Sequence, residues 1–152
     1  MATGNRLASE KKPAEAIAAY DRALARQKDD PTVLFDRGTS RAEGGDLDGA
    51  ASDLRAASQS AALRGPAFYN LGNALMAKEK WSEAAEAYRQ SLMASAGDRR
   101  AKWNLEVALR KLEEKKKKQE QKEKDQQQQK EQQQDQPQKD EQQQQQQQHQ
   151  QQ

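Results

Sequence analysis

Apolar residues recur at three- or four-residue spacing along the first part of the chain, up to about residue 112. This spacing puts them on one face of a helix, because side chains three and four positions apart are neighbours on its surface. Turn-forming residues interrupt the pattern, among them Pro31, Pro66 and the Gly44-Gly45 pair. The pattern predicts helices near residues 3–11, 14–27, 32–43, 47–61, 66–78, 82–95 and 99–117.

The helical pattern has a fixed period, which is marked by glycines at intervals of 34 residues: Gly4, Gly38 and Gly72. The same period brings an alanine, then a large residue, then a small residue, always at the same distance after the glycine. These are Ala16, Ala50 and Ala84, then Tyr20, Leu54 and Tyr88, then Ala23, Ala57 and Ser91. A 34-residue period with matched residue types is typical of stacked helix–turn–helix units.

The residue types of the pattern have a steric explanation. If the glycine is numbered position 8, positions 8 and 20 of the three full units hold only Gly or Ala, which lets two helices cross within ~8–10 Å. The second unit departs from the pattern, since Arg37 and Arg41 take the apolar positions 7 and 11. A fourth, partial unit has Glu106 at position 8 and no partner helix. A single pair cannot bury its own apolar face, so neighbouring pairs must stack.

The clearest unit is the third, FYNLGNALMAKEKWSEAAEAYRQSL from Phe68 to Leu92, and it resembles the tetratricopeptide repeat. The resemblance implies an all-α fold, a right-handed superhelical stack of helix–turn–helix hairpins. The expected domain covers residues 1–112, with repeats at about 1–30, 31–64 and 65–97 and a capping helix at 98–117. The resemblance also implies a non-enzymatic scaffold for protein–protein interaction.

In this family the first helices of the repeats line a concave groove that holds an extended peptide or a partner helix. Position 5 faces the groove, and here it is Met1, Phe35, Tyr69 and Trp103. Position 9 is Asn5, Thr39, Asn73 and Val107. The resemblance thus predicts a partner-binding groove that includes Asn5, Phe35, Thr39, Tyr69, Asn73, Arg100 and Trp103. A second interpretation stays open, in which Phe35 and Trp103 pack between repeats.

Chaperone-binding members of the family clamp a C-terminal carboxylate with Lys at 5 and Asn at 9 of one repeat, Asn at 6 of the next, and Lys at 2 and Arg at 6 of the third. Read from the first repeat, only Asn5 matches this set. Read from the second repeat, Asn70 matches and Arg100 is a basic substitute. The sequence therefore disfavours such a clamp, and a co-chaperone adaptor is the alternative function.

A narrower resemblance covers about residues 66–130. The runs YNLGNAL, EAAEAYRQSL and AKWNLEVALRKLEE, followed by a Gln-rich tail, are similar to the tetratricopeptide proteins of bacterial Bat (aerotolerance) operons. That resemblance implies an envelope-associated complex whose partners are von Willebrand factor type A domain proteins or a MoxR-type ATPase. It implies an inner-membrane-associated or periplasmic location if the chain is a fragment of such a protein, and a cytoplasmic one otherwise.

Residues with catalytic or metal-binding chemistry are scarce. The chain has no cysteine, and its single histidine, His149, lies in the Gln-rich tail. Nucleophilic triads, metal-ligand spacings and phosphate-binding loops are absent from the sequence, so no enzyme activity, cofactor or metal is expected. Residues 1–112 hold 18 basic and 15 acidic side chains, a balance that does not indicate nucleic acid as a partner. No apolar run approaches the ~18 residues of a membrane span.

The tail from residue 118 to 152 consists mostly of Gln, interrupted by Lys, Glu and Asp. Such a segment has no apolar face to bury, so it cannot offset the entropy lost on ordering. The sequence therefore predicts a disordered, low-complexity tail. The last helix is expected to continue some turns into it, because Lys, Glu and Gln favour helix, and to stop by Pro137.

Overall fold

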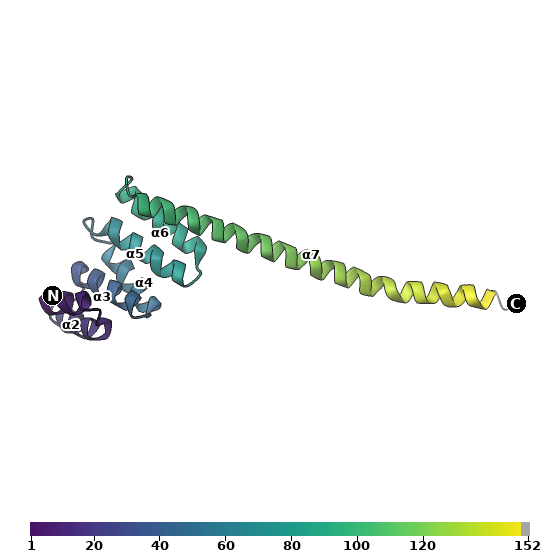
Figure 1. Ribbon diagram of the computed structural model, residues 1–152, viewed down its shortest axis with the longest axis horizontal. Coiled ribbons are helices and arrows are strands. Elements are labelled where there is room, and N and C mark those ends of the chain that lie inside the picture. The colour runs from purple at the N-terminus through teal and green to yellow at the C-terminus, as the bar shows by residue number, and fades with distance from the viewer. Residues whose placement is uncertain (150–152) are drawn as a thin grey trace. The chain divides into compact units, whose positions relative to one another are not determined.

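The computed structural model describes the backbone of residues 1–149 and the side chains of residues 1–131. Over that range it is all-helical, which confirms the predicted fold class. The helices, labelled in Figure 1, are α1 (Ala2–Ser9), α2 (Pro13–Arg26), α3 (Pro31–Glu43), α4 (Leu47–Ala57), α5 (Arg64–Ala77), α6 (Trp81–Ala94) and α7 (Arg99–His149). Residues Met1–Leu112 form one compact unit, and the rest of α7 belongs to a second.

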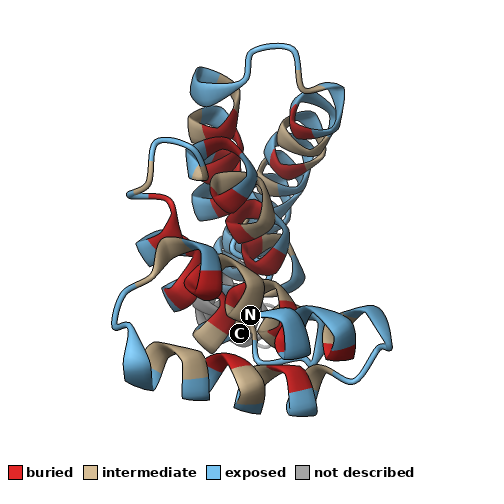
Figure 2. Ribbon diagram, turned by 90° about the vertical axis from the view of Figure 1, so that its left-hand side faces the viewer, coloured by how far each residue is buried: buried red, intermediate tan, exposed pale blue. Residues whose placement is uncertain are grey.

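The helices of the compact unit stack as antiparallel pairs. Helices α1 and α2, α3 and α4, and α5 and α6 pack against each other, and α2 on α3 and α4 on α5 join one pair to the next. Buried residues lie on the sides of the helices that face a neighbour, and exposed residues lie on the outer sides (Figure 2). The stack therefore buries the apolar face that each helix pair would leave exposed on its own.

Two of the periodic glycines lie directly under a tyrosine ring. A Cβ atom added to Gly4 would lie 2.5 Å from Cε1 of Tyr20, and one added to Gly72 would lie 2.5 Å from Cε1 of Tyr88. Real Cβ atoms do not come this close to a carbon atom, so only glycine lets the ring approach the first helix of each pair this closely. Both tyrosines are 1% exposed, and this contact sets the separation of the two helices.

The second pair has the smaller Leu54 in place of the tyrosine, and its packing is different. A Cβ atom on Gly38 would still be too close to Cγ of Leu54, at 2.9 Å. The space beside it is taken by a buried carboxylate, Asp53, whose side chain is 5% exposed. Arg37 donates to both oxygens of Asp53 at 2.7 Å, and Arg41 donates to Oδ2 at 2.9 Å.

The two arginines at apolar positions of the second repeat therefore form a network of ion pairs. Arg37 also donates to Asp21 of α2, at 2.7 Å, so it links the first pair of helices to the second. Hydrogen bonding to Asp53 raises the pKa of Arg37 despite its burial, and Asp21 adds to the effect. A buried charge is tolerated only when it is paired, and here each charge has at least one partner.

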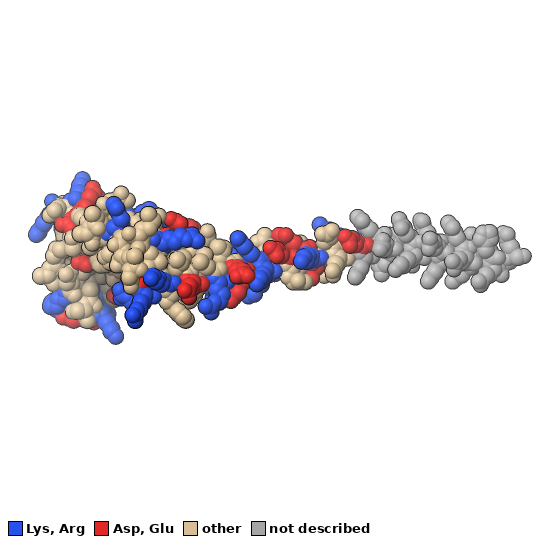
Figure 3. All heavy atoms as spheres, turned by 90° about the horizontal axis from the view of Figure 1, so that it is seen from above, with Lys and Arg blue, Asp and Glu red and all other residues tan. Residues whose placement is uncertain are grey.

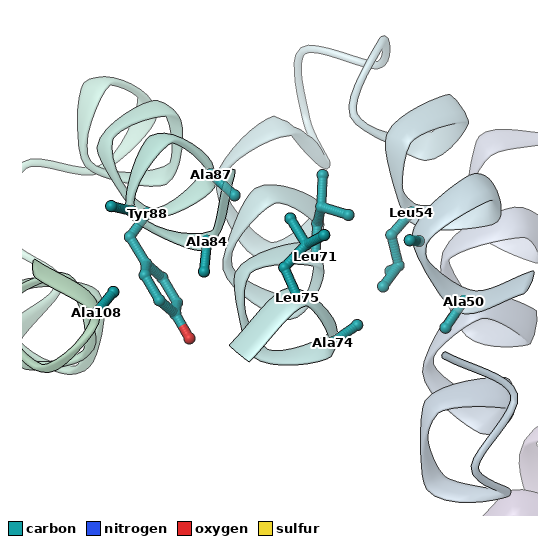
Figure 4. Packing of buried hydrophobic residues seen from close by; sticks show 11 residues of the cluster. Ala50, Leu54, Leu71, Ala74, Leu75, Ala84, Ala87, Tyr88 and Ala108 are labelled. Atoms are coloured by element: carbon teal, nitrogen blue, oxygen red, sulfur yellow. The ribbon is translucent and has the colours of Figure 1, made fainter. Parts of the chain in front are cut away.

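The central apolar cluster joins the second pair of helices, the third pair and the start of α7. Leu71 and Leu75 of α5 lie toward Leu54 of α4, and Tyr88 of α6 lies between α5 and Ala108 of α7 (Figure 4). Tyr88 and Ala108 are almost fully buried. The first turns of α7 thus cap the stack, as the sequence predicts.

The end of the last helix differs from the prediction. The predicted capping helix stops at residue 117, followed by a disordered tail over 118–152, but α7 continues to His149. Pro137 lies inside α7, so the expectation that it stops the helix is wrong, and Lys, Glu and Gln on both sides have high helix propensity. Residues 150–152 lie outside the described part of the chain.

Local side-chain pairs account for helix in a segment with no apolar face. Every side chain from residue 113 to 131 is exposed. Side chains four residues apart are nonetheless joined, Gln to an acidic residue or Lys to Glu, and each such pair stabilises a helix by ~0.2–0.5 kcal/mol. The pairs are Glu113–Lys117, Gln119–Glu123, Gln121–Asp125 and Gln127–Glu131. Helix propensity and the missing apolar face alone predict only a few further turns, because neither includes these pairs.

Replacing Gly72 with leucine is expected to lower the free energy of unfolding by about 3 kcal/mol, because the new side chain must displace the Tyr88 ring in a close-packed core. Gly97→Leu is the matched control, since a Cβ atom there has nothing within 4 Å, and it should change stability by less than about 0.5 kcal/mol. Urea unfolding followed by circular dichroism measures both. Equal stability of the two variants would contradict the proposed steric role of Gly72.

Asp53→Ala is expected to lower the free energy of unfolding by about 3–5 kcal/mol, because it leaves Arg37 and Arg41 without their buried partner. Asp21→Ala removes only the exposed partner of Arg37 and should cost less than about 1 kcal/mol. Urea unfolding of the two variants provides the comparison. Similar losses for both would show that Asp53 does not hold the second repeat together.

Candidate peptide-binding groove

The residues predicted for position 5 differ in how far they are exposed. Phe35 of α3 and Tyr69 of α5 are half-buried and pack against the central cluster while keeping an open edge. Trp103 of α7 is 62% exposed and Met1 is 50% exposed. The interpretation that Trp103 packs between repeats is therefore wrong, whereas Phe35 both packs in the core and lines open space.

Two cavities adjoin at Phe35. The first, called here the Asp36 cavity, has a volume of about 330 Å³ and is lined by residues of α1, α2 and α3, including Asn5, Tyr20, Asp36 and Glu43. The second, called the Arg100 cavity, has a volume of about 350 Å³. It is lined by residues of α3, α5, α6 and the start of α7, including Tyr69, Asn70, Asp98 and Arg100. Together they form a groove on the first helices of the repeats.

The Arg100 cavity has an aromatic wall and a cation. The Arg100 guanidinium carbon lies 5.0 Å from the centre of the Tyr69 ring, which is the geometry of a cation–π contact. The Tyr88 ring packs against the Tyr69 ring, with the two ring centres 6.1 Å apart. Asp98 begins α7 by accepting from the backbone N–H groups of Arg100 and Ala101, at 2.9 and 3.3 Å.

The polar residues at position 9 are hydrogen-bonded to the tyrosines within their own repeats. The Asn73 amide oxygen accepts from the Tyr88 hydroxyl at 2.8 Å. The Asn5 amide lies 2.9 Å from the Tyr20 hydroxyl in the same way. The second repeat has no tyrosine, and there Thr39 donates to the carbonyl of Phe35. The side chains at position 9, which were predicted to bond a peptide backbone, therefore already use part of their hydrogen-bonding capacity within the repeats.

A second polar row, at position 6, joins each repeat to the one before it. Asn104 donates to Asn73 at 3.1 Å, and Asn70 donates to Thr39 at 3.2 Å. With its amide nitrogen turned to satisfy its neighbours, Asn5 donates to Asp36 at 3.2 Å. Sequence analysis did not predict this row, although Asp36, Asn70 and Asn104 are spaced by 34 residues as the glycines are.

The sequence of residues 1–64 matches the tetratricopeptide repeat family, and residues 65–97 match it again. Residues 1–97 are tetratricopeptide repeats. A relative from Mycosarcoma maydis, small glutamine-rich tetratricopeptide repeat-containing protein 2, is 32% identical over 91 residues, which are 60% of this chain and 26% of the relative. The chain thus spans about a quarter of the length of that relative.

Solved tetratricopeptide domains have the same fold. The Sgt2 domain from Aspergillus fumigatus is 27% identical with a TM-score of 0.70, over 76% of this chain and 78% of that one. The first domain of Spaghetti (RPAP3), solved bound to the HSP90 peptide SRMEEVD, is 23% identical with a TM-score of 0.68, over 72% of this chain and 87% of that one. The second likeness concerns the fold alone.

The repeats bring most of the predicted groove residues together, but not all in one place. Phe35, Tyr69 and Arg100 line the Arg100 cavity, and Asn5, Phe35 and Thr39 line the Asp36 cavity. Asn73 contributes through its bond to Asn104, and Trp103 is exposed on α7 outside both linings.

The described part of the repeats offers little other chemistry. No group of three or more acidic or histidine residues there could hold a metal ion. No helix among the described residues is long and apolar enough to cross a membrane. On the face seen in Figure 3, basic and acidic side chains alternate and do not gather by sign. The groove is therefore the feature of the repeats best suited to binding.

Tyr88 should make stability depend on pH, because burial raises its pKa from 10.0 to about 12. The folded repeats hold the phenol proton more tightly than the unfolded chain. The resulting stability is complete below pH 10 and is lost as the pH rises to about 12. Relative to Tyr88→Phe, the wild-type chain should lose up to about 3 kcal/mol across this window in urea unfolding. Parallel pH profiles of the two proteins would contradict this assignment.

Proposed function

We propose that this chain is an adaptor of the co-chaperone type, whose repeats bind the C-terminal segment of a partner protein in the groove. Tetratricopeptide repeats are protein-interaction scaffolds and non-enzymatic in general, which agrees with the sequence analysis. The finer assignment to co-chaperones was the alternative there, and the relatives support it better than the Bat assignment.

The observation that carries the proposal is the composition of the Arg100 cavity. Phe35 and Tyr69 supply an apolar wall, which is the kind of anchor that dominates peptide affinity. Arg100, with a side chain that is 75% exposed, supplies a cation that a carboxylate can reach. Asn70 lies in the same cavity and has a second amide proton beyond the one it donates to Thr39.

The similar solved domains agree with this chemistry. The Spaghetti (RPAP3) domain holds an HSP90 peptide that ends in Val-Asp, an apolar residue followed by an acidic one. The Sgt2 domain is the more similar in sequence, and its coverage extends over most of both chains. In this chain only Asn70 and Arg100 correspond to the chaperone clamp, so we expect a carboxylate to be held by one cation, and more weakly than by a full clamp.

The Bat-type setting stays a prediction of the sequence. It would make von Willebrand factor type A proteins or a MoxR-type ATPase the partners, in the bacterial envelope. The relatives reported above give it no support, and the location of the chain in the cell likewise stays a prediction. The groove proposed here would serve a partner peptide in either setting.

The proposal is tested with fluorescein-labelled SRMEEVD with a free C-terminal carboxylate, and with the amide of SRMEEVN, whose last residue has no carboxylate. The free acid is expected to bind about tenfold more tightly than the amide, because only its last residue can place a carboxylate on Arg100. Arg100→Gln should remove that preference. Arg99→Gln is the matched control, because Arg99 is the exposed neighbour outside the cavity lining, and it should leave the preference unchanged.

Fluorescence polarisation measures the affinity of both peptides for the wild-type chain and for each variant, and a thermal melt checks that each variant is folded. Absence of binding by both peptides, or equal binding of acid and amide, would overturn the co-chaperone proposal.

A further inference from the structure

The two cavities of the groove differ in charge, because the charged residues that line the Asp36 cavity are carboxylates, whereas the Arg100 cavity is lined by an exposed arginine that is paired with one carboxylate. The Asp36 cavity is lined by two carboxylates, Asp36 and Glu43, and by no lysine or arginine among its described residues. Asp36 is held in place by the Asn5 amide. Burial raises the pKa of the Tyr20 hydroxyl, which lines the same cavity, and the charges of Asp36 and Glu43 add to this shift while a hydrogen bond with Ser40 opposes it.

Burial also raises the pKa of Asp36 itself, and the α-amino group of Met1 opposes this shift. The Asp36 side chain is only half-buried, and no described lysine or arginine lines the cavity beside it. The Asp36 cavity therefore favours the ammonium or guanidinium group of a ligand.

The Arg100 cavity contains one carboxylate, but that charge is engaged by the protein. Burial opposes ionisation of Asp98, yet its hydrogen bonds from the Ala101 and Arg100 N–H groups and from the Arg100 side chain lower its pKa overall. The Asp98 side chain is 19% exposed, against 75% for Arg100. A ligand in this cavity therefore meets the cation, while the carboxylate serves the first turn of α7.

Phe35 lines both cavities, so an apolar ligand side chain placed on it has the acidic space on one side and Arg100 on the other. Asp36 is on α3 and Arg100 is on α7, two first helices further along the stack. Neighbouring first helices are ~8–10 Å apart, so Asp36 on α3 and Arg100 on α7 are separated by roughly 20 Å. An extended peptide covers that distance in about six residues, at ~3.3 Å each.

From this arrangement we propose that the groove selects an extended segment with a fixed order of charges: a basic side chain near its amino end, an apolar side chain on Phe35 and Tyr69, and a carboxylate on Arg100 about six residues after the basic one. This inference rests on the proposed function, which places the carboxyl end of the segment at Arg100 and so sets its direction, and it adds the chemistry of the partner segment. A peptide with the charges exchanged, bound in that same direction, would place a carboxylate against Asp36 and a cation against Arg100. Such like-charge contacts weaken association strongly.

The test uses two heptapeptide libraries, both amidated and labelled with fluorescein at the amino end, so that the α-amino group is blocked and the lysine side chain stays free. One has Lys first, Leu fourth and Asp seventh, and the other has Asp first, Leu fourth and Lys seventh, with the other four positions randomised. The two libraries have the same net charge, so a difference reports the order of charges alone. The first is expected to bind the wild-type chain at least about tenfold more tightly. A third preparation, the first library with a free C-terminus, shows whether a terminal carboxylate replaces the Asp side chain at Arg100.

Charge-neutral variants complete the test. Asp36→Asn keeps an oxygen that accepts from Asn5, and Arg100→Gln changes an exposed side chain, so both should stay folded. Each should reduce the preference for the first library, and the double variant should abolish it while still binding peptide. Asp29→Asn and Arg99→Gln, outside both cavity linings, are the matched controls and should keep the preference.

Equal binding of the two libraries by the wild-type chain would overturn the charge-order inference and leave peptide binding intact. Failure of every library and of SRMEEVD to bind would overturn the proposed function itself. A preference that survives in the Asp36→Asn, Arg100→Gln double variant would also overturn the inference, because the order would then be read by other residues.

Discussion

The contact between a glycine and a tyrosine ring is the constraint on which the other features of the repeats depend. In the first and third repeats the ring of Tyr20 or Tyr88 lies on the backbone of Gly4 or Gly72, where even a methyl group would not fit. The contact fixes how closely the paired helices approach. It also brings the tyrosine hydroxyl to an asparagine one residue after the glycine. The packing of a tyrosine against a glycine therefore places an asparagine, bonded to the tyrosine hydroxyl, beside the groove.

That asparagine in turn connects successive repeats. Asn73 accepts from Tyr88 of its own repeat and from Asn104 of the next, so one side chain carries a core contact outward to an inter-repeat contact. The second repeat lacks the tyrosine, and Thr39 and Asn70 make the connection there. The polar row of the groove is thus largely structural. In the proposed function, specificity for a ligand therefore rests on the aromatic residues at position 5 and on the charged residues of the two cavities.

Periodicity made the fold predictable, because glycines at a 34-residue interval report a backbone contact that no other residue permits. The family resemblance predicted Phe35 and Tyr69 for a groove, and both line the Arg100 cavity. The network around Asp53 was not predicted, since Arg37 and Arg41 appeared only as losses from the apolar pattern, and their partner lies 16 and 12 residues further on. The length of α7 was underestimated because helix stability there comes from pairs of side chains four residues apart and not from an apolar face.

The network around Asp53 also bears on the charge of the groove. Arg37 and Arg41 lie on α3, the helix that supplies Phe35 and Asp36, yet both are turned toward carboxylates of the stack and are largely buried. Both arginine charges are therefore paired with carboxylates inside the fold. Asp36 of α3 lines the Asp36 cavity, and no arginine of the described residues lines that cavity with it. The cation of the groove comes instead from Arg100, at the start of the capping helix, where it lies on Tyr69. The arginines that make the second repeat atypical are thus paired within the fold, and they do not neutralise the carboxylates that line the Asp36 cavity.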